Sequence, residues 1–287
     1  MGARESDQMG QRSAMSMIAI KGARLEVLDE SSGDPVLLIQ TGLTADELFP
    51  LAARLRDRFR TILNHRRGYG QSTPIVGPGS IASDAADCRA LLEAMRIPRV
   101  HVVGFSYSGA VAMQLAADAG DLVHTLTLIE PPPVHVQSAP EFRAANERFF
   151  AARHARGPEA ALDELLTRVI GPNWRTDMER HLPRSAEQTR RDARTFFDAD
   201  IPALLAWQFS ARDAGRITSP VLHVGAGDSG PWFAEVRRLI LDWFPGAADV
   251  VVDGADHSLA LTHTDQVATA IISFLRGHPM SEPGVLP

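Results

Sequence analysis

The chain has 287 residues, 45% of them hydrophobic, and is long enough for one large core or for a core with an inserted subdomain. A net charge of −6 and a pI near 5.9 argue against the clustered positive charge that nucleic-acid binding or a polybasic membrane surface would need. The single cysteine, Cys88, excludes an intramolecular disulfide and a cysteine-based zinc site, and the single lysine, Lys21, argues against mechanisms that require a lysine.

The first 16 residues are polar and lack the apolar stretch of a signal peptide, so we expect them to form a disordered tail. No run in the sequence reaches the roughly 18 apolar residues of a membrane span, and we expect a cytoplasmic protein. Short apolar runs rich in β-branched residues then predict eight strands. These are Met17–Ile20, Arg24–Leu28, Val36–Gln40, Arg60–Leu63, Val100–Val103, Leu126–Ile129, Val221–Val224 and Val250–Val252.

Helical patterns separate these runs from the third onward. Residues 81–95 place Ile81 and Cys88 along one apolar side at helical spacing, and further helices are expected over 106–117 and 265–275. Several strands are apolar almost throughout, as strands buried on both faces are. The alternation therefore indicates an α/β fold with a mostly parallel eight-stranded sheet and helices on both faces.

The strand pattern stops for about 85 residues between Glu130 and Ile217. This segment begins with three consecutive prolines, which cannot continue a central strand or a helix, and it is then helical in pattern. We expect a helical insertion over 131–216 between the two parts of the core, 17–130 and 217–276. Residues 277–287 are expected to form a C-terminal tail.

Small residues surround a serine directly after the fifth predicted strand. The stretch Gly104-Phe105-Ser106-Tyr107-Ser108-Gly109 opens a predicted helix, and a tight turn there would push the Ser106 hydroxyl out above the sheet. Larger neighbours would collide inside such a turn. Ser108 stands where this G-x-S-x-G pattern usually has its second glycine. The context predicts that Ser106 is a nucleophile.

A serine hydroxyl needs a base within hydrogen-bond reach, and the base needs a partner that fixes its tautomer. His257 lies in the loop between the last predicted strand and the last predicted helix, and we expect it to be the general base. We assign the acid to Asp228, which follows the Val221 strand. Glu130, at the end of the Leu126 strand, is the alternative acid. All these positions lie just beyond the carboxyl ends of parallel strands, where side chains can converge.

Backbone donors are needed for the negative charge that develops on the carbonyl oxygen. The segment Gln40-Thr41-Gly42-Leu43 follows the Val36 strand, and a turn there needs a glycine where the backbone approaches the substrate. We assign the N–H groups of Leu43 and Tyr107 to this oxyanion hole.

A second glycine-rich stretch, Gly225 to Gly230, matches the G-x-G-x-x-G pattern of dinucleotide-binding loops, and Asp253 ends the next predicted strand. Only about 34 residues follow Asp253, too few for the remaining strands and helices of such a domain. We therefore expect no bound cofactor, although a cofactor-dependent oxidoreductase using this loop stays open as an alternative.

Over roughly Met17 to Arg276 the chain resembles the α/β-hydrolase superfamily, and residues 65–72 are similar to the D-x-R-G-x-G-x-S loop of many members. The resemblance implies a nucleophile elbow at Ser106, a helical cap over the active site, and hydrolysis of esters or related acyl compounds without metal or cofactor. Three positions depart from the common pattern. Thr41 replaces a frequent histidine, His65 an aspartate, and Asp256 a glycine, which places an extra charge beside His257.

We therefore predict a carboxylesterase-like serine hydrolase that acts on a small-molecule substrate through an acyl-enzyme on Ser106. Phe149, Trp174 and Trp207 are candidates for the wall of an acyl pocket. The same triad could instead serve C–C bond hydrolysis or a lyase-like reaction, and a non-catalytic small-molecule receptor could use the same scaffold. The sequence indicates neither the substrate nor the oligomeric state.

Overall fold

The computed structural model describes residues 15–280, and its centre is an eight-stranded sheet. The strand order is β1-β2-β4-β3-β5-β6-β7-β8, with β2 antiparallel to both β1 and β4 and every other neighbouring pair parallel. This confirms the predicted mostly parallel sheet. The strands are β1 (Ser16–Ile20), β2 (Ala23–Glu30), β3 (Pro35–Ile39), β4 (Arg60–Asn64), β5 (Val100–Phe105), β6 (Val123–Ile129), β7 (Val221–Ala226) and β8 (Ala248–Val252).

Helices occupy most of the connections between the parallel strands. They are α1 (Phe49–Leu55), α2 (Ile81–Ala94), α3 (Tyr107–Asp118), η1 (Gly120–Leu122), α4 (Ala139–Arg156), α5 (Pro158–Val169), α6 (Trp174–His181), α7 (Ser185–Thr195), η2 (Phe196–Asp200), α8 (Ile201–Ala206), α9 (Ala211–Ala214), α10 (Pro231–Trp243), α11 (Leu259–Thr262) and α12 (Thr264–Arg276). Within residues 15–280, none of these is long and apolar enough to cross a membrane.

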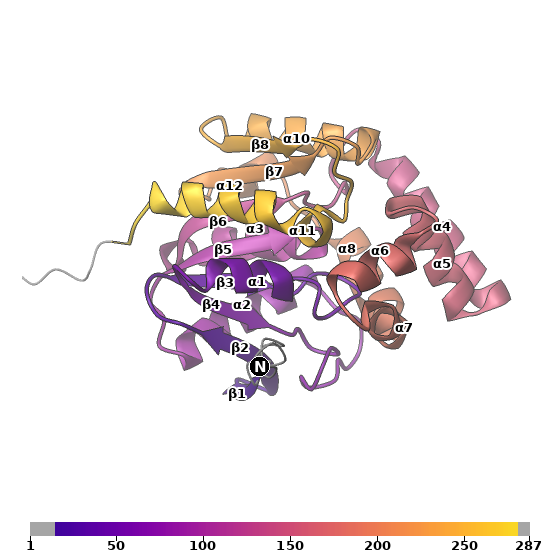
Figure 1. Ribbon diagram of the computed structural model, residues 1–287, viewed down its shortest axis with the longest axis horizontal. Helices are drawn as coiled ribbons and strands as arrows, with labels where there is room; N and C mark the ends of the chain where they lie inside the picture. Colours follow the sequence, from indigo (N-terminus) through magenta and orange to yellow (C-terminus); the bar gives the residue numbers. More distant parts are fainter. Residues whose placement is uncertain (1–14, 281–287) are drawn as a thin grey trace, which may run out of the picture.

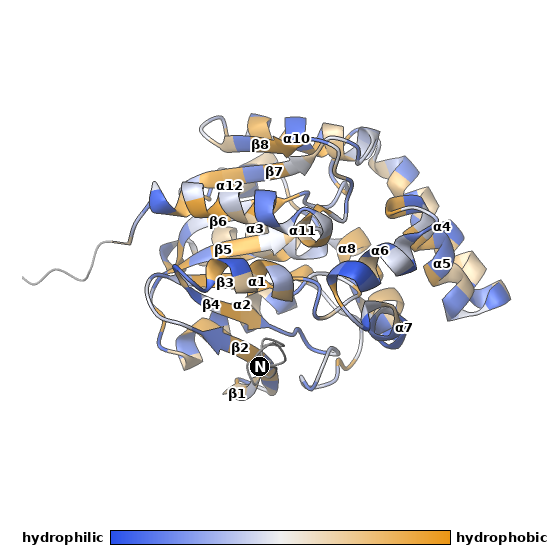
Figure 2. Ribbon diagram, viewed as in Figure 1, coloured by the Kyte–Doolittle hydropathy of each residue, from blue (hydrophilic) through white to orange (hydrophobic). Residues whose placement is uncertain are grey.

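The sheet is buried on both faces because its side chains alternate between two apolar clusters. Leu37 and Val102 pack into the cluster that includes α2, α3 and α10, whereas Leu38 and Val103 pack into the cluster that includes α1 and α12. Figure 1 shows α1 and α12 lying over one face of the sheet. In Figure 2 the inner strands are largely hydrophobic, and the helices carry both kinds of residue. This three-layer packing explains the unbroken apolar strand runs.

The segment between β6 and β7 is helical from α4 to α9, as the proline-rich start and the loss of strand pattern suggest. Its helices α4 to α7 lie together beside the sheet, at the side where α11 lies (Figure 1). Much of it is held by a third apolar cluster, which contains Phe149, Leu162 and Trp174 and also includes Leu43 and Leu261 from the core. The predicted tails fall largely outside the described residues, since only Met15 and Ser16 of the first and 277–280 of the second are included.

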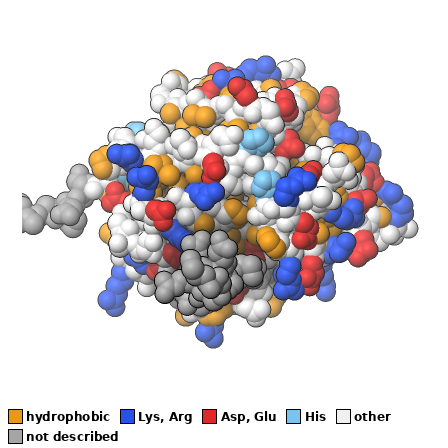
Figure 3. All heavy atoms as spheres, in the orientation of Figure 1, with side chains coloured by type: hydrophobic (Ala, Val, Ile, Leu, Met, Phe, Trp, Pro, Cys, Tyr) orange, Lys and Arg blue, Asp and Glu red, His pale blue; other side chains and the backbone are white. Residues whose placement is uncertain are grey.

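The face in Figure 3 carries acidic and basic side chains interspersed with one another. The described part of this face therefore shows no large patch of like charge.

Candidate active site

Ser106 lies in a strained turn between β5 and α3. Its backbone has φ 50° and ψ −120°, a left-handed conformation that a serine rarely adopts. Gly104 makes the turn possible, because a Cβ there would lie 2.3 Å from the carbonyl oxygen of Ser108. The side chain of Ser108 holds the turn from within: its Oγ accepts from the Phe105 N–H at 2.9 Å and lies 3.0 Å from the Phe105 carbonyl, to which it donates. Serine therefore fits where the common pattern has glycine.

The side chains of Ser106, His257 and Glu130 form a continuous hydrogen-bonded chain. His257 Nε2 lies 2.9 Å from Ser106 Oγ, and His257 Nδ1 lies 2.7 Å from Glu130 Oε2. Glu130 is 2% exposed and is fixed by two further bonds, from the Ala226 N–H to Oε1 and from the Ser229 hydroxyl to Oε2. Its carboxylate is thus oriented before any substrate binds.

The structure places Glu130, and not Asp228, against the histidine. Glu130 follows β6, the strand next to β5, and its backbone φ of 37° turns the residue at the strand end. Asp228 is exposed, and its loop is held to the β8 loop by a bond from its own N–H to the Ala255 carbonyl at 2.8 Å. The assignment of the acid to Asp228 is therefore corrected to the alternative that the sequence left open.

The imidazole of His257 is also held by two aromatic rings. Phe233 stacks on it with ring centroids 4.2 Å apart and an interplanar angle of 25°, and Phe105 lies on it at 5.2 Å. The neighbouring Asp256 uses its Oδ1 to accept from the N–H and hydroxyl of Ser258. That carboxylate therefore stabilises the turn after the histidine.

The two predicted oxyanion donors differ in their surroundings. Tyr107 is the first residue of α3, where N–H groups have no acceptor within the helix. The Leu43 N–H already donates to the Tyr69 hydroxyl at 3.1 Å, and the Tyr69 hydroxyl in turn donates to Asp200. Leu43 would have to share or release this bond to bind an oxyanion. The loop is tightly packed. Leu43 has a positive φ of 72°, and a Cβ on Gly42 would lie only 3.1 Å from the Phe196 ring.

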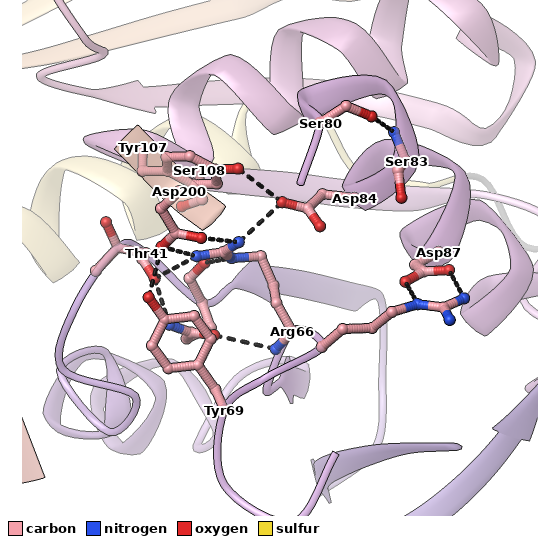
Figure 4. Close-up of polar contacts among 12 residues, drawn as sticks. Thr41, Arg66, Tyr69, Ser80, Ser83, Asp84, Asp87, Tyr107, Ser108 and Asp200 are labelled. Carbon is pink, nitrogen blue, oxygen red and sulfur yellow. Dashed lines mark hydrogen bonds and ion pairs between the residues drawn. The ribbon is translucent and has the colours of Figure 1, made fainter. Parts of the chain in front are cut away.

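A buried ion-pair network underlies this loop. The guanidinium of Arg66, which is 4% exposed, lies between the carboxylates of Asp84 at 2.8 Å and Asp200 at 2.7 Å (Figure 4). It also donates to the carbonyls of Gln40 and Thr41. Burial alone would lower the pKa of Arg66, but the two carboxylates hold it well above its ordinary value. Asp200 belongs to η2, so the network joins the helical insertion to the loop after β3.

His65 lies outside the reacting group, in the loop where an aspartate is common. Its ring is 4% exposed and bonds Glu26 through Nδ1 and Asp46 through Nε2, both at 3.0 Å. Burial lowers its pKa, but the bonds to Asp46 and Glu26 outweigh burial and raise the pKa to about 9. His65 is therefore a buried imidazolium that ties β2 to the loop before α1.

A cavity of about 140 Å³ opens at Ser106 and His257. Its wall comes from the loop after β3, the turn before α3 and the helical insertion, and it is mostly apolar, with Phe142, Leu165 and Ile201 among its residues. Of the three predicted pocket residues, Phe149 lines this cavity. A larger hollow of about 610 Å³, lined by Glu26 and His65 among others, contains neither Ser106 nor His257.

The other two predicted pocket residues lie elsewhere. Trp174 is fully buried within the insertion, with its Nε1 donating to Asp163. Trp207 packs on Phe209, and its Nε1 donates to Gln114 of α3. Both indoles thus serve packing, which aromatic residues at helical spacing usually do. Nothing in the local pattern separates these tryptophans from Phe149.

Sequence reasoning missed three buried ionisable residues near the site, namely Arg66, Asp200 and Glu47. Arg66 lies within the loop that resembles D-x-R-G-x-G-x-S, so the loop itself was a signal. Glu47 follows Asp46 in a loop, and Asp200 lies two residues after Asp198, so only the folded chain shows that Glu47 and Asp200 are buried.

Comparisons with known proteins identify the family of the chain. The family model for the alpha/beta hydrolase fold matches residues 35–264. A putative carbamate hydrolase, RutD, of Variovorax paradoxus is 30% identical over 275 residues, which cover 91% of this chain and 97% of the relative. Rhodomycin D methylesterase DauP of a Streptomyces species is 25% identical, with 88% and 94% covered. A thermophilic esterase from Thermogutta terrifontis superposes with a TM-score of 0.78 at 20% identity, covering 93% of this chain and 99% of the other.

The match spans most of the chain, and it includes the elbow, the loop after β3 and the histidine loop. The chain therefore belongs to the alpha/beta hydrolase family, and it is a hydrolase.

Proposed function

We propose that the protein is a serine hydrolase that cleaves the acyl bond of a small ester through an acyl-enzyme on Ser106. The observation that carries this proposal is the chain of bonds from Ser106 Oγ through His257 to Glu130, with the hydroxyl on the wall of an apolar cavity. A hydroxyl paired with an oriented imidazole is the arrangement that nucleophilic acyl transfer requires.

In the first half-reaction, Ser106 Oγ attacks the substrate carbonyl while His257 Nε2 takes the hydroxyl proton. Glu130 accepts a hydrogen bond from the Nδ1–H and stabilises the imidazolium that forms. The Tyr107 N–H, with Leu43 sharing its bond to Tyr69, would stabilise the charge on the carbonyl oxygen. His257 then gives the proton to the leaving group, and the acyl group stays on Ser106.

In the second half-reaction, His257 removes a proton from water, which attacks the acyl-enzyme carbonyl. The carboxylic acid leaves as the proton returns to Ser106 Oγ. Three observations support a small acyl group: the cavity volume is only about 140 Å³, its wall is mostly apolar, and the Phe196 ring lies so close to Gly42 that a Cβ there would be 3.1 Å from it.

Carbamate hydrolysis is the second candidate, and the relatives favour it, because several of those most similar in sequence carry the name carbamate hydrolase. The same serine chemistry applies, since a carbamate also has a carbonyl with a leaving group. Comparison of p-nitrophenyl butyrate with p-nitrophenyl N-methylcarbamate distinguishes the two candidates. Rapid turnover of the ester with slow release from a carbamoyl-enzyme would favour the ester.

The triad is tested by three single variants and hydrolysis of p-nitrophenyl esters of increasing chain length. We expect Ser106→Ala to lower kcat by about 10⁴-fold or more, because the nucleophile is lost. Glu130→Gln should lower it by about 10²-fold to 10⁴-fold, because the amide cannot stabilise the imidazolium.

Asp228→Asn is the matched control, because it makes the same change in the acid that the sequence favoured. We expect it to retain activity within about threefold of the parent protein. A fluorophosphonate probe should label the parent protein at Ser106 and leave Ser106→Ala unlabelled. Loss of activity in Asp228→Asn with full activity in Glu130→Gln would reverse the assignment of the acid, and absence of labelling would point to a receptor.

A further inference from the structure

The wall of the active-site cavity holds a carboxyl group that the acyl-transfer steps do not use. Glu47 lies in the loop between β3 and α1, lines the same cavity as Ser106 and His257, and is 8% exposed. Among the described residues, its side chain has no hydrogen-bond or ion-pair partner. A buried carboxyl group without a partner is costly, so its presence needs a reason.

The hydroxyl groups of three other residues in the cavity wall, Thr41, Thr44 and Tyr107, bond within the protein. The Thr41 hydroxyl donates to the Phe105 carbonyl, and the Thr44 hydroxyl lies 2.7 Å from that of Thr189. The Tyr107 hydroxyl donates to Asp84 at 2.9 Å. Glu47 differs from these residues, since it lines the cavity without a side-chain hydrogen bond or ion pair among the described residues.

A second group on the same wall has acceptor capacity left. Asn146 of α4 is 3% exposed, and its Nδ2 donates to the Phe142 carbonyl at 2.8 Å, which leaves Oδ1 as a free acceptor among the described contacts. Three charged or titratable groups share the cavity with Glu47: Arg168, which is exposed and lies over the Trp232 ring, His257, and Tyr107, whose hydroxyl bonds Asp84. None of these pairs with Glu47.

We propose that Glu47 is a specificity residue that binds a protonated amine on the substrate. The substrate class would then be a small acyl compound that carries an ammonium group besides the scissile bond. An ammonium ion offers three donors and one positive charge, which match a buried carboxylate and an amide oxygen on the wall of the same cavity. In a cavity with a mostly apolar wall the attraction between the two charges is stronger than in water.

The charge state of the empty site is consistent with such a partner. Burial raises the pKa of Glu47 to about 8, so the group is mostly neutral at pH 7, with about one-tenth ionised. Neutrality keeps the empty cavity free of an unpaired charge. A cation would stabilise the ionised form, and binding at pH 7 would release close to one proton from Glu47 to the buffer, about 0.9 per ligand.

This inference rests on the proposed function only in taking Ser106 as the reacting group, so its test does not depend on turnover. Titration calorimetry on the Ser106→Ala protein measures the binding of n-alkylammonium ions from butylammonium to hexylammonium. The titrations are run at pH 7 in buffers of different ionisation enthalpy, which gives the number of protons released. Hexanamide is the neutral comparison ligand.

We expect at least one alkylammonium ion to bind with release of about 0.9 proton. Glu47→Gln in the same background should weaken this binding by at least about tenfold and abolish the proton release, because glutamine keeps the shape and loses the charge. Glu159→Gln is the control for long-range effects, because Glu159 is an exposed residue of α5 and the substitution also replaces a glutamate with glutamine. It should leave the affinity and the number of protons released unchanged. Because Glu47 is largely neutral, Glu47→Gln should fold normally, which thermal unfolding checks.

Three outcomes would overturn the inference: no ammonium ion binds, binding is unaffected by Glu47→Gln, or hexanamide binds through Glu47 while the ammonium ions do not. The last would assign a neutral amide to the site. Ammonium binding with an inactive parent enzyme would instead contradict the proposed function and leave the role of Glu47 intact.

Discussion

His65 illustrates how a single side chain can make stability depend on pH. The imidazolium is almost fully buried between Asp46 and Glu26, and its pKa of about 9 in the folded protein compares with about 6.5 for an exposed histidine. The contribution of this raised pKa is fully present below pH 6.5 and is lost as the pH rises through 9.

We therefore expect the free energy of unfolding of the parent protein to fall between pH 6.5 and pH 9, by up to about 3 kcal/mol from His65. Urea denaturation of the parent protein and of His65→Gln measures it, and the difference between the two should shrink across this range. Glu47 acts in the same direction between pH 4.5 and 8, because its pKa is raised by burial. Both curves are therefore measured in a Glu47→Gln background, and a constant difference would contradict the role of His65.

At the scale of elements, η2 connects the helical insertion to the core through one carboxylate. It is a single π-helical stretch between α7 and α8, a type of irregularity often found at functional sites. Phe196 at its start lines the cavity, and Asp200 at its end bonds Arg66 and Tyr69. The π-helical stretch thus contributes to the cavity wall and also supports the loop after β3 through Arg66.

We expect Asp200→Ala to lower the free energy of unfolding by about 3 to 5 kcal/mol, because it leaves the buried Arg66 with a single carboxylate, Asp84. Chemical denaturation measures the loss. The surface pair Arg184 and Glu187 provides a control, since Glu187→Ala removes an exposed ion pair and should cost at most about 1 kcal/mol. Equal costs for the two variants would show that the Arg66 network contributes little.

Much of the fold follows from local pattern, whereas the site depends on contacts between distant segments. The eight apolar runs correspond to the eight strands of the sheet. Ser106 and His257 both follow strands at the same edge of the sheet, and their side chains lie within hydrogen-bond distance. The carboxylate that contacts His257 could not be predicted from the pattern, because Asp228 and Glu130 both follow strands of the same sheet and only the loop geometry decides between them. Glu47 and Asp200 were also missed, because each stands close to another acid in the sequence and such acids are mostly exposed.

For the whole molecule, Cys88 reports on global opening. Its side chain is 0% exposed in the cluster between the sheet and α2, and burial raises the pKa of its thiol. Because the chain has only this cysteine, reaction with a thiol reagent such as DTNB should be negligible in the native protein. One thiol per chain should react in urea, with a midpoint that coincides with the loss of circular dichroism. Rapid labelling without urea would show that this face of the sheet opens locally.

The bond between Arg66 and Asp200 also limits how the two parts of the chain can diverge or be recombined. A chimera that takes its insertion from a relative without an acid at position 200 would leave the buried Arg66 guanidinium with only one of its two carboxylates, Asp84. Arg66 also donates to the carbonyls of the loop after β3, so the position of that loop would be disturbed. Exchanging the helical insertion to change the substrate would therefore destabilise the core loop after β3, unless Asp200 is retained in the new insertion or Arg66 is replaced at the same time.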